Sequence, residues 1–201
     1  DTPITFAAHD MMQLVGYGMT QAAVRQVYAA SGIGPEDVDV LVVATTTPDQ
    51  TVPATASTVQ EVLGLDCGAF DLNAACSGFV YALVVAHGLL AIGHRCALVV
   101  GADALSRITD WEDRGTAILF GDAGGAVVLE AATTDGLLAW DLSSDGSGRN
   151  LLYADVGDTM RSLWIASGPQ VSAFEKRLSD YVVGRPVITL TAATAALEVA
   201  L

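Results

Sequence analysis

Basic residues are scarce in this chain of 201 residues, in which 9 Lys and Arg stand against 23 Asp and Glu. The formal charge is −14, and residues 1–100 and 101–201 each carry −7, so the acidic excess is not local. No basic stripe is present that could displace the counterions of a polyanion. We therefore expect neither nucleic acid nor a membrane surface as a partner.

Long hydrophobic runs and paired cysteines are missing as well. Gly, His, Asp or Arg interrupts every apolar run before the length of about 18 residues that a membrane span needs, so the 52% of hydrophobic residues predicts deep burial. The three cysteines include no CxxC pair and no His at ligand spacing, which argues against a zinc site or a disulfide framework. No secretory signal is visible. A reduced, cytoplasmic setting is expected.

Helical and strand patterns alternate along most of the chain. The helical patterns cover residues 14–31, 54–63 and 78–92. The strand patterns cover residues 38–44, 67–72, 96–100, 116–120 and 125–130. Such alternation predicts an α/β layered architecture with a largely parallel sheet. Residues 78–92 are apolar on every side, which predicts a helix at the centre of a layered domain.

Cys76 closes one predicted strand and opens that apolar helix. The first turn of a helix presents unpaired N–H groups and a partial positive charge, which favour a thiolate nucleophile. The backbone N–H of Cys76 could also help to hold an oxyanion. The alternative is an inert buried thiol, because free Cys is among the most buried residue types. Its position alone leaves both interpretations of Cys76, nucleophile and inert thiol, open. Cys67 and Cys96 are predicted to be core residues.

A polar loop follows at residues 109–115. Trp111 and Arg114 are planar groups that could stack on a nucleotide base or hold a phosphate. On the residues alone, neutralisation of Arg114 by the three neighbouring acids is the better interpretation. The glycine-rich residues 121–125 lack a phosphate-loop pattern, and a tight turn between two strands is predicted for them.

Four segments of the chain form longer motifs: VVATTTPD at residues 42–49, DLNAACSGFVYAL at residues 71–83, VVGAD at residues 99–103 and DRGTAILFGDAGGA at residues 113–126. In this order and spacing they resemble the β-ketoacyl-acyl-carrier-protein synthase III family of the thiolase superfamily. The segment at residues 71–83 is similar to the active-cysteine segment of that family, and the segment at residues 113–126 is similar to a second signature. The resemblance covers about residues 20–131 and favours Cys76 as a nucleophile.

The resemblance implies a thiolase-like layered α/β fold with a mixed sheet and a buried central helix after the cysteine. It implies a homodimer in which Cys76 takes an acyl group from acyl-CoA. The acyl-enzyme then condenses with malonyl-acyl-carrier protein and releases carbon dioxide, in fatty-acid or polyketide initiation. No cofactor and no metal are expected beyond these substrates.

The same resemblance implies roles for three further residues. Arg114 would contact the adenine end of CoA, and Trp111, a planar group in the same loop, is added as a candidate for substrate binding on its chemistry alone. Phe120 would line the pocket beneath the cysteine. Val52 would reach the acyl pocket of the partner subunit, and its small side chain predicts tolerance for branched or longer primers.

The family pattern breaks in the last third of the chain. The His and Asn of the family's second half, in segments resembling PHQAN and GNT, are absent, since no His follows residue 94 and the asparagines are Asn73 and Asn150. We interpret residues 1–135 as an N-terminal thiolase-like half, and residues 136–201 as a connecting loop and a partial or divergent second half. Residues 186–197 faintly resemble the segment that carries the Asn. The chain is thus expected to be part of a longer subunit.

Two other functions stay open from the sequence. One is a cysteine acyltransferase or thioesterase of the same fold that performs no condensation. The other is a non-catalytic dimer partner with a vestigial cysteine.

Overall fold

The computed structural model describes residues 18, 20–133, 137, 139–155, 161, 162 and 176. The chain divides into two compact units, and we describe each by itself. The first contains residues 1–105 and 121–142, and the second contains residues 106–120 and 143–201. No helix among the described residues has the length and apolar character needed to cross a bilayer.

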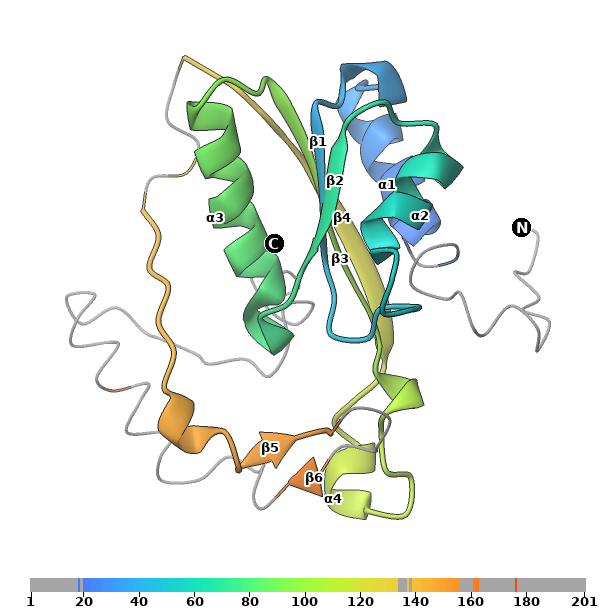
Figure 1. The fold of residues 1–201 in the computed structure, drawn as a ribbon, viewed down its shortest axis with the longest axis vertical. Helices are drawn as coiled ribbons and strands as arrows, with labels where there is room; N and C mark the ends of the chain where they lie inside the picture. Colours follow the sequence, from blue (N-terminus) through green and yellow to red (C-terminus); the bar gives the residue numbers. More distant parts are fainter. Residues whose placement is uncertain are drawn as a thin grey trace. The chain divides into compact units, whose positions relative to one another are not determined.

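A mixed four-stranded sheet forms the framework of the first unit (Figure 1). Its strands are β1 (Val40–Ala44), β2 (Gly68–Leu72), β3 (Cys96–Ala104) and β4 (Asp122–Glu130). The order is β2-β1-β3-β4, in which β1 pairs parallel with β2 and β3, and β4 runs antiparallel to β3. The β-branched residues of β1 and β3 suit a strand that is buried on both faces.

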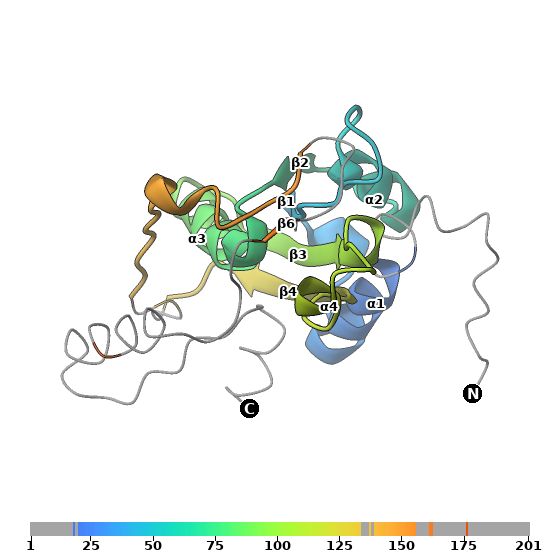
Figure 2. The same ribbon diagram turned by 90° about the horizontal axis from the view of Figure 1, so that it is seen from below.

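Three helices cover the two faces of this sheet. They are α1 (Thr20–Ser31), α2 (Thr55–Leu63) and α3 (Gly78–Ala91). Helices α1 and α2 lie on one face, and α3 lies on the other (Figures 1 and 2). Alternate residues of the strands supply the two cores: Leu41 and Leu98 belong to the α1–α2 side, whereas Val42 and Val99 belong to the α3 side.

The layered α/β fold with a mixed sheet is confirmed, and the strands and helices over residues 38–104 lie close to their predicted positions. Helix α3 was predicted to be buried on every side, and in the structure only one side of it is buried. Its side toward the sheet is buried at Gly78, Ala82 and Ala86, whereas Val80 is exposed. The described part of the chain supplies one layer against this helix, and a helix facing one layer buries one side.

Two predictions around residue 120 are wrong. Residues 116–120 form no strand, because Asp113 caps the short helix α4 (Arg114–Ala117) instead. Residues 121–125 therefore do not turn between two strands, and from Asp122 onward they form the first part of β4. Gly124 and Gly125 pair there with Ala102 and Gly101 of β3.

The second unit holds little regular structure among its described residues. Besides α4 it contains the end of one 3-10 helix, η5 (Leu105–Arg107), a second 3-10 helix, η6 (Gly146–Gly148), and one antiparallel strand pair. That pair joins β5 (Leu152–Tyr153) to β6 (Arg161–Ser162). The faint resemblance of residues 186–197 lies outside the described residues.

Candidate active site around Cys76

Cys76 lies at a sharp turn between β2 and α3. Strand β2 ends at Leu72, a single 3-10 turn, η4, covers Ala75–Ser77, and α3 begins at Gly78. Ala75 has φ +47°, a left-handed conformation that costs about 1–2 kcal/mol for a residue with a Cβ. The backbone N–H of Ala75 donates to Oδ1 of Asn73 at 3.0 Å, which supports this conformation. The turn leaves Cys76 exposed. Strain of this kind clusters at functional sites.

The surroundings of Cys76 raise the pKa of its thiol rather than lower it. Desolvation by the protein around the sulfur is the main cause, and the negative charge of Asp103 adds to it. The backbone N–H of Cys76 itself acts in the opposite direction. The prediction that the helix start gives a thiolate is therefore wrong for the described structure.

The carboxyl ends of three parallel strands meet beside this turn. The loop of residues 45–47 follows β1, Asn73 follows β2, and Asp103 is the penultimate residue of β3. Thr46 Oγ1 donates to Oδ1 of Asn73 at 3.4 Å, so the first two strand ends are in contact. Crevices at the carboxyl edge of parallel strands commonly bind ligands in α/β proteins.

Asp103 ties the loop of residues 45–47 to β3 through one carboxylate oxygen. Its Oδ1 accepts from the backbone N–H groups of Thr46 at 2.7 Å and Thr47 at 3.2 Å. The hydroxyls of Thr45 and Thr47 also donate to it, each at 3.2 Å. Thr47 Oγ1 in turn accepts from the N–H of Ala104 at 2.8 Å. The loop is thus fixed around a half-buried charge on the neighbouring strand.

A glycine on β3 makes room for the helix that carries Cys76. A Cβ at Gly101 would lie 3.0 Å from Cδ2 of Phe79, the second residue of α3. Gly101 and Asp103 are two residues apart on the strand, so both face the α3 side of the sheet. The close approach of α3 to β3 therefore depends on the missing side chain.

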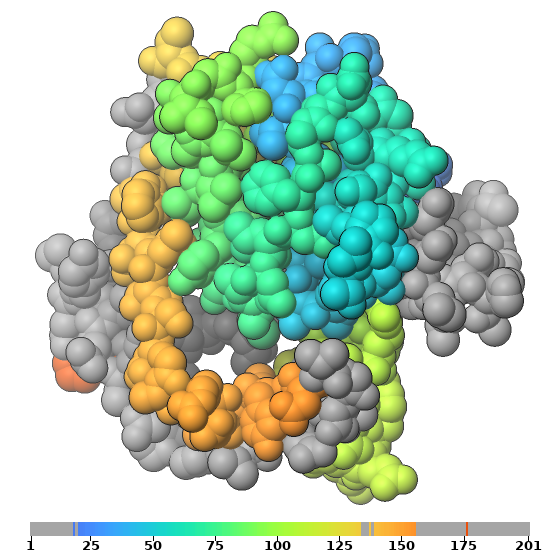
Figure 3. All heavy atoms as spheres, viewed as in Figure 1, coloured from blue at the N-terminus to red at the C-terminus, as the bar shows by residue number. Residues whose placement is uncertain are grey.

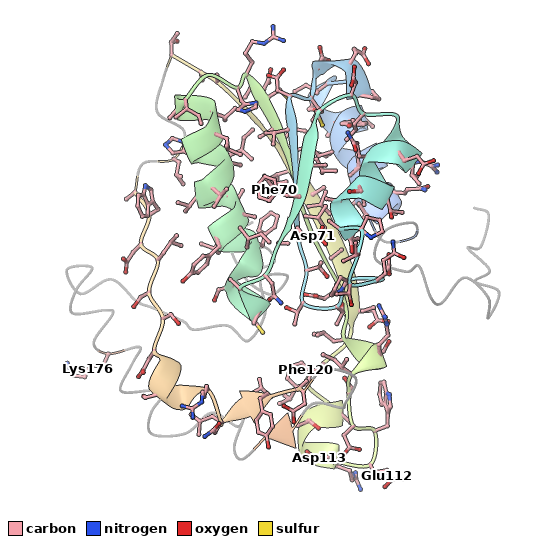
Figure 4. All side chains as sticks on the ribbon, viewed as in Figure 1. Phe70, Asp71, Glu112, Asp113, Phe120 and Lys176 are labelled. Atoms are coloured by element: carbon pink, nitrogen blue, oxygen red, sulfur yellow. The ribbon has the colours of Figure 1, made fainter. Side chains whose placement is uncertain are left out.

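Asp71 fixes the start of α2 on the opposite face. Its carboxylate accepts from the N–H groups of Thr55 at 2.8 Å and Ala56 at 2.7 Å. Figure 4 labels Asp71 beside its neighbour Phe70, and the two side chains of β2 leave opposite faces of the sheet. The cap holds the loop before α2, in which Val52 precedes a cis proline, Pro53. Val52 is 81% exposed, so nothing described covers its side chain.

The other three predicted site residues belong to the second unit. Trp111 is 62% exposed, and its Nε1 donates to the carbonyl of Ser106 at 3.3 Å. Arg114 is exposed, and it forms no ion pair with any described residue. The neighbouring Asp113, labelled in Figure 4, caps α4 instead: its carboxylate accepts from Gly115 N at 2.9 Å and from Thr116 Oγ1 at 3.0 Å. Phe120 is half-buried. The approach of these residues to Cys76 stays a prediction.

The remaining cysteines behave as core residues. Cys96 is buried, and burial raises the pKa of its thiol to about 11. Cys67 is half-buried, and desolvation likewise raises its pKa. Within the described ranges, His, Cys, Asp and Glu side chains form no group of three that could hold a metal ion. Cys76 is therefore the exposed thiol of the described structure.

Asp103 and the three threonines were missed by reasoning from the sequence. One signal was available, because an acid within the apolar run CALVVGADA is rarely buried without a partner. The partners themselves lie 56 to 58 residues away in sequence, and only the pairing of β1 with β3 brings them together.

Two family models match different parts of the chain. The model of 3-oxoacyl-[acyl-carrier-protein] synthase III matches residues 70–146, which contain Cys76 and Asp103. The model of the DegT/DnrJ/EryC1/StrS aminotransferase family matches residues 148–201. This second match offers a different origin for the segment that we interpret as a divergent second half, and that interpretation stays a prediction.

Curated relatives resemble about two thirds of the chain closely. β-Ketoacyl-[acyl-carrier-protein] synthase III of Erythrobacter litoralis is 54% identical over 145 residues, which are 69% of this chain and 45% of the relative. The enzyme of the same name from Caulobacter vibrioides is 53% identical over 143 residues, 67% of this chain and 44% of the relative. The chain thus spans less than half the length of the curated relatives it matches.

Solved structures show the same likeness. The synthase III of Thermus thermophilus is 38% identical with a TM-score of 0.71, and the match covers 83% of this chain and 55% of that one. The priming β-ketosynthase of the R1128 polyketide pathway is 28% identical with a TM-score of 0.63, covering 92% and 50%. On the identity to these relatives and the match of the synthase III model, the chain belongs to the β-ketoacyl-[acyl-carrier-protein] synthase III family.

Proposed function

We propose that Cys76 accepts an acyl group from acyl-CoA as the first step of a decarboxylative condensation with malonyl-acyl-carrier protein. The observation that carries the proposal is the exposed Cys76 thiol at a strained turn, at the carboxyl edge of three parallel strands. That turn lies in the segment that the synthase III model matches.

The first step exchanges one thioester for another. The Cys76 Sγ attacks the acyl carbonyl carbon, a new S–C bond forms, and the S–C bond to CoA breaks. The thiol proton leaves Cys76 and is taken up by the departing CoA thiolate, so protons balance. Because the pKa of Cys76 is raised, a bound substrate or a neighbouring group has to assist the loss of this proton.

The second step would join the acyl group to a two-carbon unit. Loss of carbon dioxide from the malonyl thioester gives a carbanion, which attacks the acyl carbonyl and releases the Cys76 thiolate. The His and Asn that the resemblance expects for this step have no counterpart in these 201 residues. We therefore assign the acyl-transfer step to the described residues and derive no part of the second step from them.

The substrate contacts follow from the same proposal. Arg114 and Trp111 bind CoA, and their exposure together with the lack of a described ion pair for Arg114 supports this role. Phe120 lines the acyl pocket. Val52 limits the depth of the pocket in a partner subunit, and its 81% exposure leaves it free to do so. The proposal includes acceptance of branched or longer primers, and it fails on this point if acetyl-CoA alone acylates Cys76.

A homodimer is part of the proposal. Strand β2 is an edge of the sheet, and it lies at the surface between α3 and α2 (Figure 3). Its Phe70 is 36% exposed, and an exposed edge strand can pair with another chain. Sedimentation of the wild-type chain and of a Phe70→Lys variant would test whether this edge joins two copies.

One experiment separates the proposed function from its alternatives. The protein is incubated with radiolabelled acyl-CoA, and malonyl-acyl-carrier protein is then added while released carbon dioxide is collected. Label that is present in wild type and lost in Cys76→Ala supports acyl transfer, and carbon dioxide release adds condensation. Label without carbon dioxide, or hydrolysis of acyl-CoA, favours the acyltransferase or thioesterase alternative. Wild type without any label contradicts the proposed function and leaves the non-catalytic partner.

A further inference from the structure

We propose that Asp103 is a positioning residue for Cys76: its carboxylate holds the loop of residues 45–47 against β3, and that loop supports the turn that carries the thiol. The inference rests on the proposed function of Cys76, since positioning matters where the thiol reacts. It concerns a residue of β3 that lies 27 positions beyond the cysteine in the sequence.

The geometry of the carboxylate carries the first step of the argument. One oxygen, Oδ1, collects four donors from three consecutive residues, at 2.7 to 3.2 Å. Two of these donors are backbone N–H groups, so the bonds fix the path of the chain and not only its side chains. Charge-assisted bonds of this kind are about twice as strong as neutral ones. Without Asp103, the buried Thr45 and Thr47 side chains and the Thr46 amide would lose this charged acceptor, whereas the Thr47 amide also donates to Thr45 Oγ1 at 3.2 Å.

A short series of contacts connects this loop to the cysteine turn. Thr45 N–H donates to the carbonyl of Leu72 at 3.1 Å, at the end of β2. Thr46 Oγ1 then donates to Oδ1 of Asn73, and the same oxygen accepts from the N–H of Ala75. Ala75 is the residue in the left-handed conformation directly before Cys76. The contacts thus run from β3 through the β1 loop to the backbone of the turn.

The negative charge of Asp103 also acts on the Cys76 thiol. Among the titratable groups on the elements around Cys76, it is the one whose charge adds to desolvation in raising the thiol pKa. Asp71 on β2 binds the first turn of α2 instead, and the N–H of Asp49 after β1 donates to Thr55 Oγ1 at 3.3 Å. On α3, Tyr81 and His87 lie further along the helix. The carboxylate therefore couples the position of the turn to the protonation of the nucleophile.

The test uses the full chain and two variants of Asp103. Asp103→Asn keeps an acceptor oxygen and removes the charge, whereas Asp103→Ala removes both. Alkylation of Cys76 by uncharged iodoacetamide is followed across pH by mass spectrometry of the Cys76 peptide. Hydrogen exchange at the amides of Thr46 and Thr47 reports the loop.

We expect Asp103→Asn to lower the pH midpoint of Cys76 alkylation, because it removes the negative charge that adds to desolvation in raising the thiol pKa. The alkylation rate at pH 8 would then rise, since the thiolate fraction follows the midpoint. Cys67, which responds to Asp39 and Asp66, is the internal control and should keep its midpoint. In Asp103→Ala the amides of Thr46 and Thr47 lose protection, while Asp103→Asn retains it.

A second pair of variants keeps the proposal testable if Asp103→Ala does not fold. Thr46→Val removes the hydroxyl that reaches Asn73 and keeps the size of the side chain, and Thr46→Ser restores the hydroxyl. We expect Thr46→Val to lower the rate constant of acylation by acyl-CoA severalfold with little change in its half-saturating concentration, and Thr46→Ser to recover it.

The outcomes separate this inference from the proposed function. Equal midpoints in wild type and Asp103→Asn, or unchanged protection in a folded Asp103→Ala, overturn the role of Asp103. Equal acylation by Thr46→Val and Thr46→Ser overturns the contact series. Absence of any acylation in wild type together with a shifted alkylation midpoint contradicts the proposed function and leaves the effect of Asp103 on Cys76 established.

Discussion

At the scale of single residues, the hydroxyl of Tyr28 is a buried polar atom without a hydrogen-bond partner among the described residues. Burial raises the pKa of Tyr28 to about 12, and the neighbouring Cys67, Cys96 and Glu36 add to the shift. A buried hydroxyl without a partner costs free energy, because water no longer solvates it. The hydroxyl of Tyr28 therefore offsets part of the stability that the ring of the same residue contributes by packing on the α1 side of the core.

We predict that Tyr28→Phe raises the free energy of unfolding by about 1 kcal/mol at neutral pH. The folded state holds the phenol proton more tightly than the unfolded chain, in which the pKa is about 10. Wild-type stability should accordingly fall as the pH rises from about 10 to about 12, and Tyr28→Phe should lose less over this window. Urea unfolding at several pH values measures both effects. Tyr153→Phe, at an exposed tyrosine, is the control.

The candidate site shows how far single positions can be predicted. Cys76 became the candidate nucleophile from its place between a strand pattern and an apolar helix, and from the motif around it. The sign of its pKa shift was predicted wrongly, because that sign depends on desolvation and on Asp103. Both arise from the packing of β1, β2 and β3, and neither can be obtained from the neighbours of Cys76 in the sequence.

At the scale of elements, α2 depends on a carboxylate from another strand. The N-cap residue of α2 is Ala54, whose side chain cannot accept a hydrogen bond. Asp71 of β2 accepts from the first two amides of the helix, those of Thr55 and Ala56, instead. We predict that Asp71→Ala lowers the free energy of unfolding by about 1–2 kcal/mol. Asp71→Asn, which keeps one acceptor oxygen, should lose less. Chemical denaturation measures the difference.

Asp66→Ala is the matched control for this prediction. Asp66 is exposed and lies five residues earlier, and its removal should change stability by less than about 0.5 kcal/mol. Equal losses in Asp71→Ala and Asp66→Ala would contradict the capping role of Asp71.

The end of α2 depends on a glycine conformation. Gly64 has φ +67°, and a Cβ built there would meet no atom within 4 Å. Gly64→Ala therefore tests backbone strain without a steric clash, and we predict a loss of about 1 kcal/mol. Gly68→Ala is the control, because the space around it is equally open and its φ is ordinary. Similar thermal unfolding of both variants would contradict the prediction.

Local sequence patterns predicted correctly those helices and strands whose formation agrees with their tertiary contacts. The valine-rich strands over residues 38–44 and 96–100 and the helix that ends at Gly64 formed as expected. Residues 116–120 did not, although Ile118, Leu119 and Phe120 favour a strand. Asp113 accepts from two groups in the first turn of α4, and this cap stabilises a helix where the apolar residues alone favour extension.

At the scale of the whole molecule, the acidic excess is concentrated in one unit. The unit with Cys76 contains 2 basic and 14 acidic residues, a net charge of −12, and the other unit contains 7 and 9, a net charge of −2. Arg114 and Arg149, which could meet an anionic ligand, both belong to the second unit. The sequence halves are equally acidic, so this asymmetry follows from the fold and could not be predicted from charge along the chain.

If acyl-CoA acylates Cys76 as proposed, the asymmetry predicts how salt changes the rate of that reaction. Acyl-CoA carries several negative charges, and a unit of −12 repels it over about 10 Å at 0.1 M salt and over longer distances in dilute buffer. Raising the ionic strength from about 0.01 M to about 0.15 M shortens this range and should increase the second-order rate of acylation severalfold. An uncharged acyl thioester, acyl-N-acetylcysteamine, should show little change. If instead the rate with acyl-CoA falls as salt is added, attraction by Arg114 governs the encounter, and Arg114→Gln should then abolish the salt dependence.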